Sequence, residues 1–137
     1  MLKTNPKSQH SLFPEESLLR EVTHQHRLNI GLPRENPEKE TRLALTPEGV
    51  AIVVEEGHRV FVQRGAGLPM SYTDLQYSEA GAVVVDAASD VYNADLVLKI
   101  APPTIEEIHL MHPRATIFSM LQLSNLSSDC IRFMMKK

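Results

Sequence analysis

Aromatic residues and positive charge are both in short supply in this 137-residue chain. It has no tryptophan, and three tyrosines and four phenylalanines are its only aromatic residues. Lysine and arginine together number 14 against 17 aspartates and glutamates, which gives a formal net charge of −3. Nucleic-acid-binding modules need a basic surface, and single-stranded nucleic acids also stack on aromatic side chains. We therefore expect no nucleic-acid partner.

Cysteine is also nearly absent, because Cys130 is the only one. A single thiol cannot build a disulfide framework, which favours a reducing compartment, and we expect Cys130 to be a packing residue rather than a nucleophile. The cysteine and histidine spacings match no metal site. His24 and His26 are two residues apart and so do not share a helix face. We expect no bound metal.

Long apolar runs are missing as well. No segment approaches the roughly 20 apolar residues of a membrane helix, and the polar first residues lack the apolar stretch of a signal peptide. These absences predict a cytoplasmic protein without direct membrane contact.

Short apolar segments alternate with helical segments after residue 27. Uninterrupted apolar runs such as 83–85 and 96–98 are typical of strands covered on both faces, and the short connections favour parallel pairing with right-handed crossovers. The pattern predicts a doubly wound, mostly parallel, Rossmann-like α/β sheet. The expected strands are 28–32, 59–63, 82–85, 95–100 and 115–121, and the expected helices are 47–56, 73–80, 87–92, 104–111 and one from 125 onward.

The two ends of the chain stand apart from this alternation. We expect residues 1–27 to be an N-terminal extension that is partly helical, over about 11–25, and residues 28–137 to form the domain itself. Lys137 falls inside the last predicted helix, without a C-cap. We expect a fragment of a longer enzyme, the alternative being a natural small protein with a frayed tail.

Arg42 is the first candidate site residue. Ligands of doubly wound sheets bind beyond the carboxyl ends of the strands, and Arg42 lies where the loop after the first strand meets a helix capped by Thr46. A guanidinium there matches a carboxylate in a bidentate fork. It would equally form a surface ion pair with Glu38 or Glu40, and the spacing leaves both interpretations open.

Two more candidates follow apolar strands and lie at the same edge. Lys99 must reach solvent, an acid or a ligand, while Gln122 can orient a ligand but cannot supply a proton at neutral pH. The stretch 65–67, Gly-Ala-Gly, resembles the start of a dinucleotide-binding G-x-G-x-x-G motif. Met70 stands at the third glycine position, so we expect a plain turn.

Several of these segments, taken in order, resemble the N-terminal domain of the alanine dehydrogenase and pyridine nucleotide transhydrogenase family. That family has a G-[apolar]-P-x-E box followed by an N-E-x-R-V-A-x-T-P-x-x-V box, and the resemblance covers about 28–125. The matching segments here are 31–35 (GLPRE), 39–50 (KETRLALTPEGV), 56–60 (EGHRV), 65–67 (GAG), 80–82 (AGA) and 94–99 (ADLVLK).

The resemblance implies the substrate domain of an NAD(H)- or NADP(H)-dependent oxidoreductase, with the cofactor held mainly by a second domain that this chain lacks. The substrate would be alanine and pyruvate or a related pair of small amino acid and 2-oxo acid. The full-length enzyme would be a homo-oligomer, and the fragment alone would be inactive. Arg42 matches the family arginine that holds the substrate carboxylate, and Lys99 is assigned to substrate binding.

Two positions depart from the family pattern. Ala101 replaces the second lysine of K-V-K-E-P, and Gln122 replaces the catalytic histidine of T-[apolar]-L-H-L, so Gln122 is the nearest equivalent of a catalytic residue. Transhydrogenase α subunits also lack that second lysine. Two alternatives therefore stay open: hydride transfer between NAD(H) and NADP(H), and a catalytically inactive sensor domain.

Overall fold

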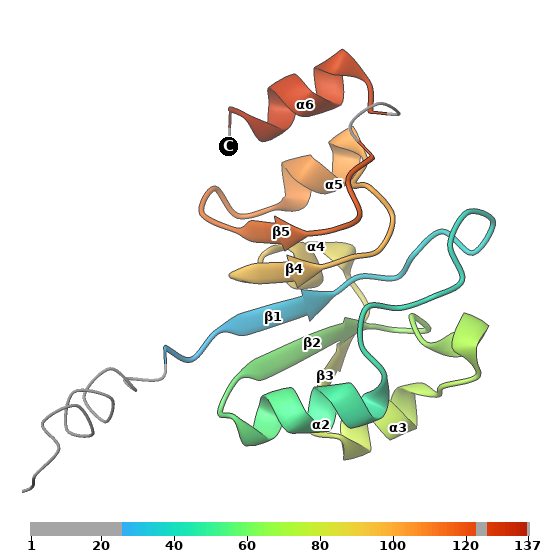
Figure 1. The fold of residues 1–137 in the computed structure, drawn as a ribbon. Coiled ribbons are helices and arrows are strands. Elements are labelled where there is room, and N and C mark those ends of the chain that lie inside the picture. The colour runs from blue at the N-terminus through green and yellow to red at the C-terminus, as the bar shows by residue number, and fades with distance from the viewer. Residues whose placement is uncertain (1–25, 123–125, 137) are drawn as a thin grey trace, which may run out of the picture.

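A computed structural model describes residues 26–122 and 126–136. The predicted helix over 11–25 lies outside these residues. The described part is built on a five-stranded sheet in the order β3-β2-β1-β4-β5, in which all neighbouring strands are parallel (Figure 1). The five strands are β1 (Asn29–Leu32), β2 (Arg59–Gln63), β3 (Val83–Val85), β4 (Leu96–Leu98) and β5 (Thr116–Phe118).

All five predicted strands are present, but β4 and β5 are shorter than the apolar pattern suggested. The register between them pairs only Leu96–Leu98 with Thr116–Phe118. Beyond Leu98 the regular ladder ends: the amide of Lys99 still donates to the carbonyl of Phe118 and the amide of Met120 to the carbonyl of Ile100, but the amide of Ile100 donates to the Glu35 carboxylate at 2.6 Å. A run of apolar residues does not show at which residue a contact with a side chain replaces the hydrogen bonds between strands.

Each predicted helix within the described residues is also present, and threonine caps define several starts. The hydroxyls of Thr46, Thr73 and Thr104 each accept a hydrogen bond from the backbone amide three residues on, which satisfies an otherwise unpaired donor. The helices are α2 (Pro47–Glu55), α3 (Asp74–Glu79), α4 (Ala88–Tyr92), α5 (Ile105–Leu110) and α6 (Ser128–Met134), with an unpredicted 3₁₀ turn η1 (Leu68–Met70).

The start of α6 was predicted too early. The hydroxyl of Ser127 accepts from the amide of Cys130 at 3.2 Å, so the helix begins at Ser128 rather than at 125. Serine and asparagine are both good N-caps, and their order of preference does not separate the two positions.

The helices cover both faces of the sheet (Figure 1). α2 packs on β2 and α3 on β3, whereas α4 contacts β1, β2 and β3 and also α5. The chain reverses its direction of travel across the sheet after β3, so the switch point lies between β1 and β4. The doubly wound architecture is confirmed.

Two apolar clusters form the core, one on each face. On the side of α2 the cluster includes Leu32, Val50, Val62 and Tyr77. The hydroxyl of Tyr77 donates to the carbonyl of Leu45 at 2.9 Å, and burial raises its pKa to about 12. The smaller cluster on the other face is formed by Tyr92, Val97 and Met111.

The close approach of α4 to β1 yields a stability prediction. A Cβ atom at Gly31 would lie 2.1 Å from the carbonyl oxygen of Val91, so Gly31→Ala should destabilise the fold by about 3 kcal/mol or more. In α2 a Cβ at Gly49 would meet its nearest neighbour, Leu45, at 3.4 Å, and Gly49→Ala should stabilise by about 0.5–1 kcal/mol. Urea unfolding of both variants is the measurement, and wild-type stability of Gly31→Ala would contradict the packing described here.

Candidate functional site

A pocket of about 430 Å³ lies over the carboxyl ends of β1 and β4, at the switch point. Its walls come from the loop after β1, the segment that joins β4 to α5, and the segment that follows β5. Arg42, Lys99 and Gln122, the three residues singled out from the sequence, all line it. The other lining residues are Glu35, Asn36, Lys39, Glu40, Ile100, Ala101, Pro102, Thr104, Glu107 and Met120.

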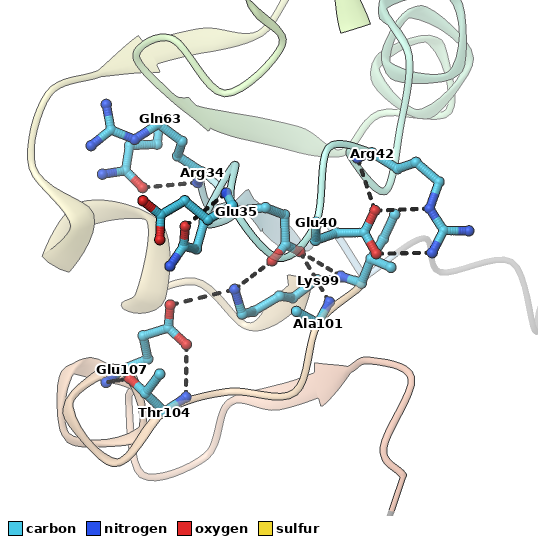
Figure 2. Close-up of polar contacts among 12 residues, drawn as sticks. Arg34, Glu35, Glu40, Arg42, Gln63, Lys99, Ala101, Thr104 and Glu107 are labelled. Atoms are coloured by element: carbon cyan, nitrogen blue, oxygen red, sulfur yellow. Dashed lines mark hydrogen bonds and ion pairs between the residues drawn. The ribbon is translucent and has the colours of Figure 1, made fainter. Parts of the chain in front are cut away.

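A buried ion pair forms part of the wall. The Nζ atom of Lys99 lies 2.7 Å from Oε2 of Glu35, and each side chain is only 4% exposed (Figure 2). The other oxygen of Glu35 accepts from the amides of Ile100 at 2.6 Å and Ala101 at 3.4 Å. Of the partners considered for Lys99, the structure shows an acid, and the loop after β1 is thereby tied to the loop after β4.

Glu107 supplies a second carboxylate to Lys99. One of its oxygens lies 3.4 Å from Lys99 Nζ, and the other accepts from the amide of Thr104 at 2.8 Å as part of the cap of α5 (Figure 2). The ammonium is thus outnumbered by two carboxylates. Tyr92 is buried nearby, and its burial together with the negative charge of Glu107 raises the pKa of its hydroxyl.

Arg42 forms the ion pair with Glu40 that the sequence left open. Its Nε and Nη2 atoms each lie 2.8 Å from a different oxygen of Glu40, and its backbone amide donates to the same carboxylate at 2.9 Å. The arginine lowers the pKa of Glu40 to about 2, and the carboxylate raises the pKa of Arg42. The pair lines the pocket, so the ion pair and a ligand-binding role are compatible.

The structure therefore brings the predicted residues to one pocket, where acids contact both cations. Carboxylates of Glu35 and Glu107 contact Lys99, and the carboxylate of Glu40 contacts Arg42. Sequence reasoning named Lys99 and Arg42 but missed Glu35 and Glu107 as site residues. For Glu35 a signal was present, since it follows a buried strand whose carboxyl end lies beside that of the lysine's strand. For Glu107 the signal was its place three residues after the cap Thr104.

The glycines at 65–67 form the expected turn. Gly65 has φ +74°, and its amide donates to the carboxylate of Asp74 at 2.8 Å. The 3₁₀ turn η1 follows rather than a helix whose N-terminus faces a phosphate. Cys130 is buried, with its Sγ 3.4 Å from the carbonyl oxygen of Pro103, as a packing residue would be.

Residues 26–122 and 126–136 hold neither a cluster of metal ligands nor a membrane-spanning helix. They contain no group of three or more histidine, cysteine, aspartate or glutamate side chains placed to hold a metal ion. Within the same ranges, every helix falls short of the length and apolar character needed to cross a bilayer.

The sheet order and the charged pocket at its switch point define a doubly wound, Rossmann-like domain. Residues 31–137 match the family model described as "Alanine dehydrogenase/PNT, N-terminal domain", and the chain belongs to this family. The alanine dehydrogenase of Staphylococcus saprophyticus is 40% identical over 96 residues, which are 70% of this chain and 26% of that protein. That of Bilophila wadsworthia is 37% identical over 97 residues, 71% of this chain and 26% of that protein.

Solved structures give the same result. An L-alanine dehydrogenase superposes with a TM-score of 0.74 at 33% identity, over 79% of this chain and 30% of that one. A transhydrogenase from Sinorhizobium meliloti superposes with a TM-score of 0.71 at 30% identity, over 77% and 31%. The chain spans about a quarter of the length of the curated relatives it matches.

Breaking the buried pair provides one test of this geometry. Lys99→Met leaves Glu35 charged and buried beside the remaining carboxylate, so we expect a loss of about 3–5 kcal/mol in the free energy of unfolding. The double variant Glu35→Gln/Lys99→Met should lose less than the sum of the two single variants. Lys39→Met, an exposed lysine of the same pocket, is the control and should stay within about 0.5 kcal/mol. Additive losses in urea unfolding would show that the pair is not coupled.

The pair at the pocket rim makes a pH prediction. The folded-state pKa of Glu40 is about 2 against an ordinary value of 4.5, so the pair's contribution to stability is complete above pH 4.5 and is lost as the pH falls toward 2. A ¹³C NMR titration of the Glu40 carboxyl should show a midpoint near pH 2. In Arg42→Gln the midpoint should return toward 4.5, and an unchanged midpoint would contradict the assignment.

Proposed function

We propose that residues 28–137 form the substrate-binding domain of an NAD(H)- or NADP(H)-dependent oxidoreductase that interconverts a small α-amino acid and its 2-oxo acid. The observation that carries this proposal is the pocket at the switch point, which combines a guanidinium at the surface with a buried ammonium. The names of the alanine dehydrogenases that the chain resembles support alanine and pyruvate as the first pair to test.

In this proposal Arg42 binds the substrate carboxylate. Its guanidinium is accessible, since 63% of the side chain is exposed, and five N–H donors leave room for a ligand beside Glu40. Lys99 contributes a positive charge at the wall of the pocket, where it faces the polar end of the substrate. Gln122 hydrogen-bonds the substrate and orients it, but an amide cannot transfer the proton that amino-acid oxidation releases.

The nicotinamide cofactor would accept the hydride, and the described residues do not fit it. The glycine turn at 65–67 leads into a 3₁₀ turn, and Met70 stands where a dinucleotide motif needs glycine. We therefore assign the cofactor mainly to a second domain and derive no step through it. A cytoplasmic homo-oligomer without direct membrane contact completes the proposal, and the 137-residue chain alone should not turn over.

One observation favours a second candidate, hydride transfer between NAD(H) and NADP(H). Ala101 lines the pocket at the position to which the family resemblance assigns a second lysine, and the transhydrogenase structure superposes almost as well as the alanine dehydrogenase. Such a reaction needs no cation for an amino-acid substrate.

The test uses the protein expressed from its complete reading frame. We expect oxidation of NADH or NADPH with pyruvate and ammonia, or with another 2-oxo acid. Arg42→Gln should raise KM for the 2-oxo acid about 10- to 100-fold, because a charge-assisted hydrogen bond is worth about 1.5–3 kcal/mol. The KM for the reduced cofactor should not change. Arg59→Gln removes a charge at the opposite end of the sheet and serves as the control.

Other outcomes of the same experiment would support a different function. Hydride exchange between the two nucleotides without turnover of any 2-oxo acid would support the second candidate. Binding of an amino acid or nucleotide without turnover would support a sensor domain. A wild-type KM in Arg42→Gln would overturn the role of Arg42.

A further inference from the structure

In the ion pair between Glu40 and Arg42, the two side chains differ in their exposure to solvent. The carboxylate side chain is 13% exposed, whereas the guanidinium side chain is 63% exposed. Exposed ion pairs are commonly weak because both side chains move freely. Here Glu40 is mostly buried and held in place, so it fixes the exposed guanidinium of Arg42.

The loop that precedes Glu40 explains why it is held. The backbone amides of Lys39 and Glu40 donate to the carbonyl oxygen of Asn36 at 3.0 and 2.8 Å, and the amide of Glu38 donates to the Asn36 side chain at 3.0 Å. The carboxylate of Glu40 then accepts from the backbone amide of Arg42 as well as from its side chain. The hydrogen bonds of the turn fix the backbone at Glu40, and the Glu40 carboxylate in turn fixes the guanidinium of Arg42.

The contacts also define which part of Arg42 remains available. A guanidinium has two edges that match a carboxylate, one formed by Nε and Nη2 and one formed by Nη1 and Nη2. Glu40 occupies the first edge with two bonds of 2.8 Å, and Nη1 points away from it (Figure 2). A second carboxylate can therefore bind bidentately without displacing Glu40.

The charges around the pocket favour the same arrangement. Glu35 and Glu107 flank Lys99, so a ligand carboxylate that approached that ammonium would meet two negative charges. At the edge of Arg42 that Glu40 leaves open, the ligand carboxylate meets positive charge first.

We propose that Glu40 is a positioning residue, which fixes Arg42 by one edge so that the other edge receives the carboxylate of a small 2-oxo acid; this inference rests on the proposed function. Glu40 does not touch the substrate. Without it the guanidinium keeps its charge but loses its fixed orientation, so ligand capture weakens while the chemical step is spared.

The experiment compares variants of the protein expressed from its complete reading frame, with pyruvate and reduced nucleotide as substrates. Glu40→Ala should raise KM for pyruvate about tenfold with kcat and the KM for the nucleotide unchanged. Glu40→Gln retains one acceptor oxygen and should lie between wild type and Glu40→Ala. Glu38→Ala removes the same charge from the same loop without a side-chain contact to Arg42 among the described residues, and should behave as wild type.

Each outcome is decisive for Glu40 and separable from the proposed function. A raised KM in Arg42→Gln with a normal KM in Glu40→Ala would overturn the positioning role and leave the clamp intact. A lowered KM in Glu40→Ala would overturn the positioning role by showing that Glu40 competes with the substrate. An equal rise of KM in Glu38→Ala would also overturn it, because the effect would then come from the loss of a negative charge in the loop.

A second measurement applies if the wild type turns over no 2-oxo acid, in which case the proposed function fails. The ¹⁵Nε signal of Arg42 is then followed in the 137-residue chain as pyruvate is added. A pyruvate-dependent shift that weakens in Glu40→Ala and persists in Glu38→Ala would support the positioning role. No shift in the wild-type chain would overturn it.

Discussion

The contact between Glu35 and Lys99 is the constraint on which the site depends. The two residues are far apart in the chain but follow neighbouring strands on either side of the switch point. A charge buried to 4% exposure is costly unless it is paired and hydrogen-bonded, and here Glu35 also accepts two backbone amides. The pair thus joins the loop that carries Arg42 to the loop that carries Ala101 and leads to Glu107.

Around this pair the pocket alternates negative and positive groups. Glu107 belongs both to the cap of α5 and to the surroundings of Lys99, so helix formation and site electrostatics share one side chain. Glu40 belongs to a turn and to the surroundings of Arg42. Each cation is paired with an acid that also accepts hydrogen bonds from backbone amides.

Most of the fold was predictable because local chemistry and the global architecture agree. Thr46 caps α2 as predicted, Thr73 and Thr104 cap helices that begin within one residue of their predicted starts, and parallel pairing follows from short right-handed crossovers. The errors occurred where tertiary contacts replace local ones. The regular pairing of β4 ends at Leu98, after which the amide of Ile100 donates to Glu35 instead of to β5, and α6 starts at Ser128 because Ser127, one of several polar residues there, supplies the cap.

The sequence by itself determined the element order, the doubly wound sheet and the edge at which Arg42, Lys99 and Gln122 meet, because capping and strand periodicity act over a few residues. Only the tertiary structure decided which acids face which bases. Lys99 pairs with Glu35, which belongs to another loop, and with Glu107, whereas Arg42 pairs with Glu40 rather than with Glu38 through the conformation of the one loop that carries all three. The contact between Glu35 and Lys99 is set by how β1 and β4 pack side by side, which no local pattern records.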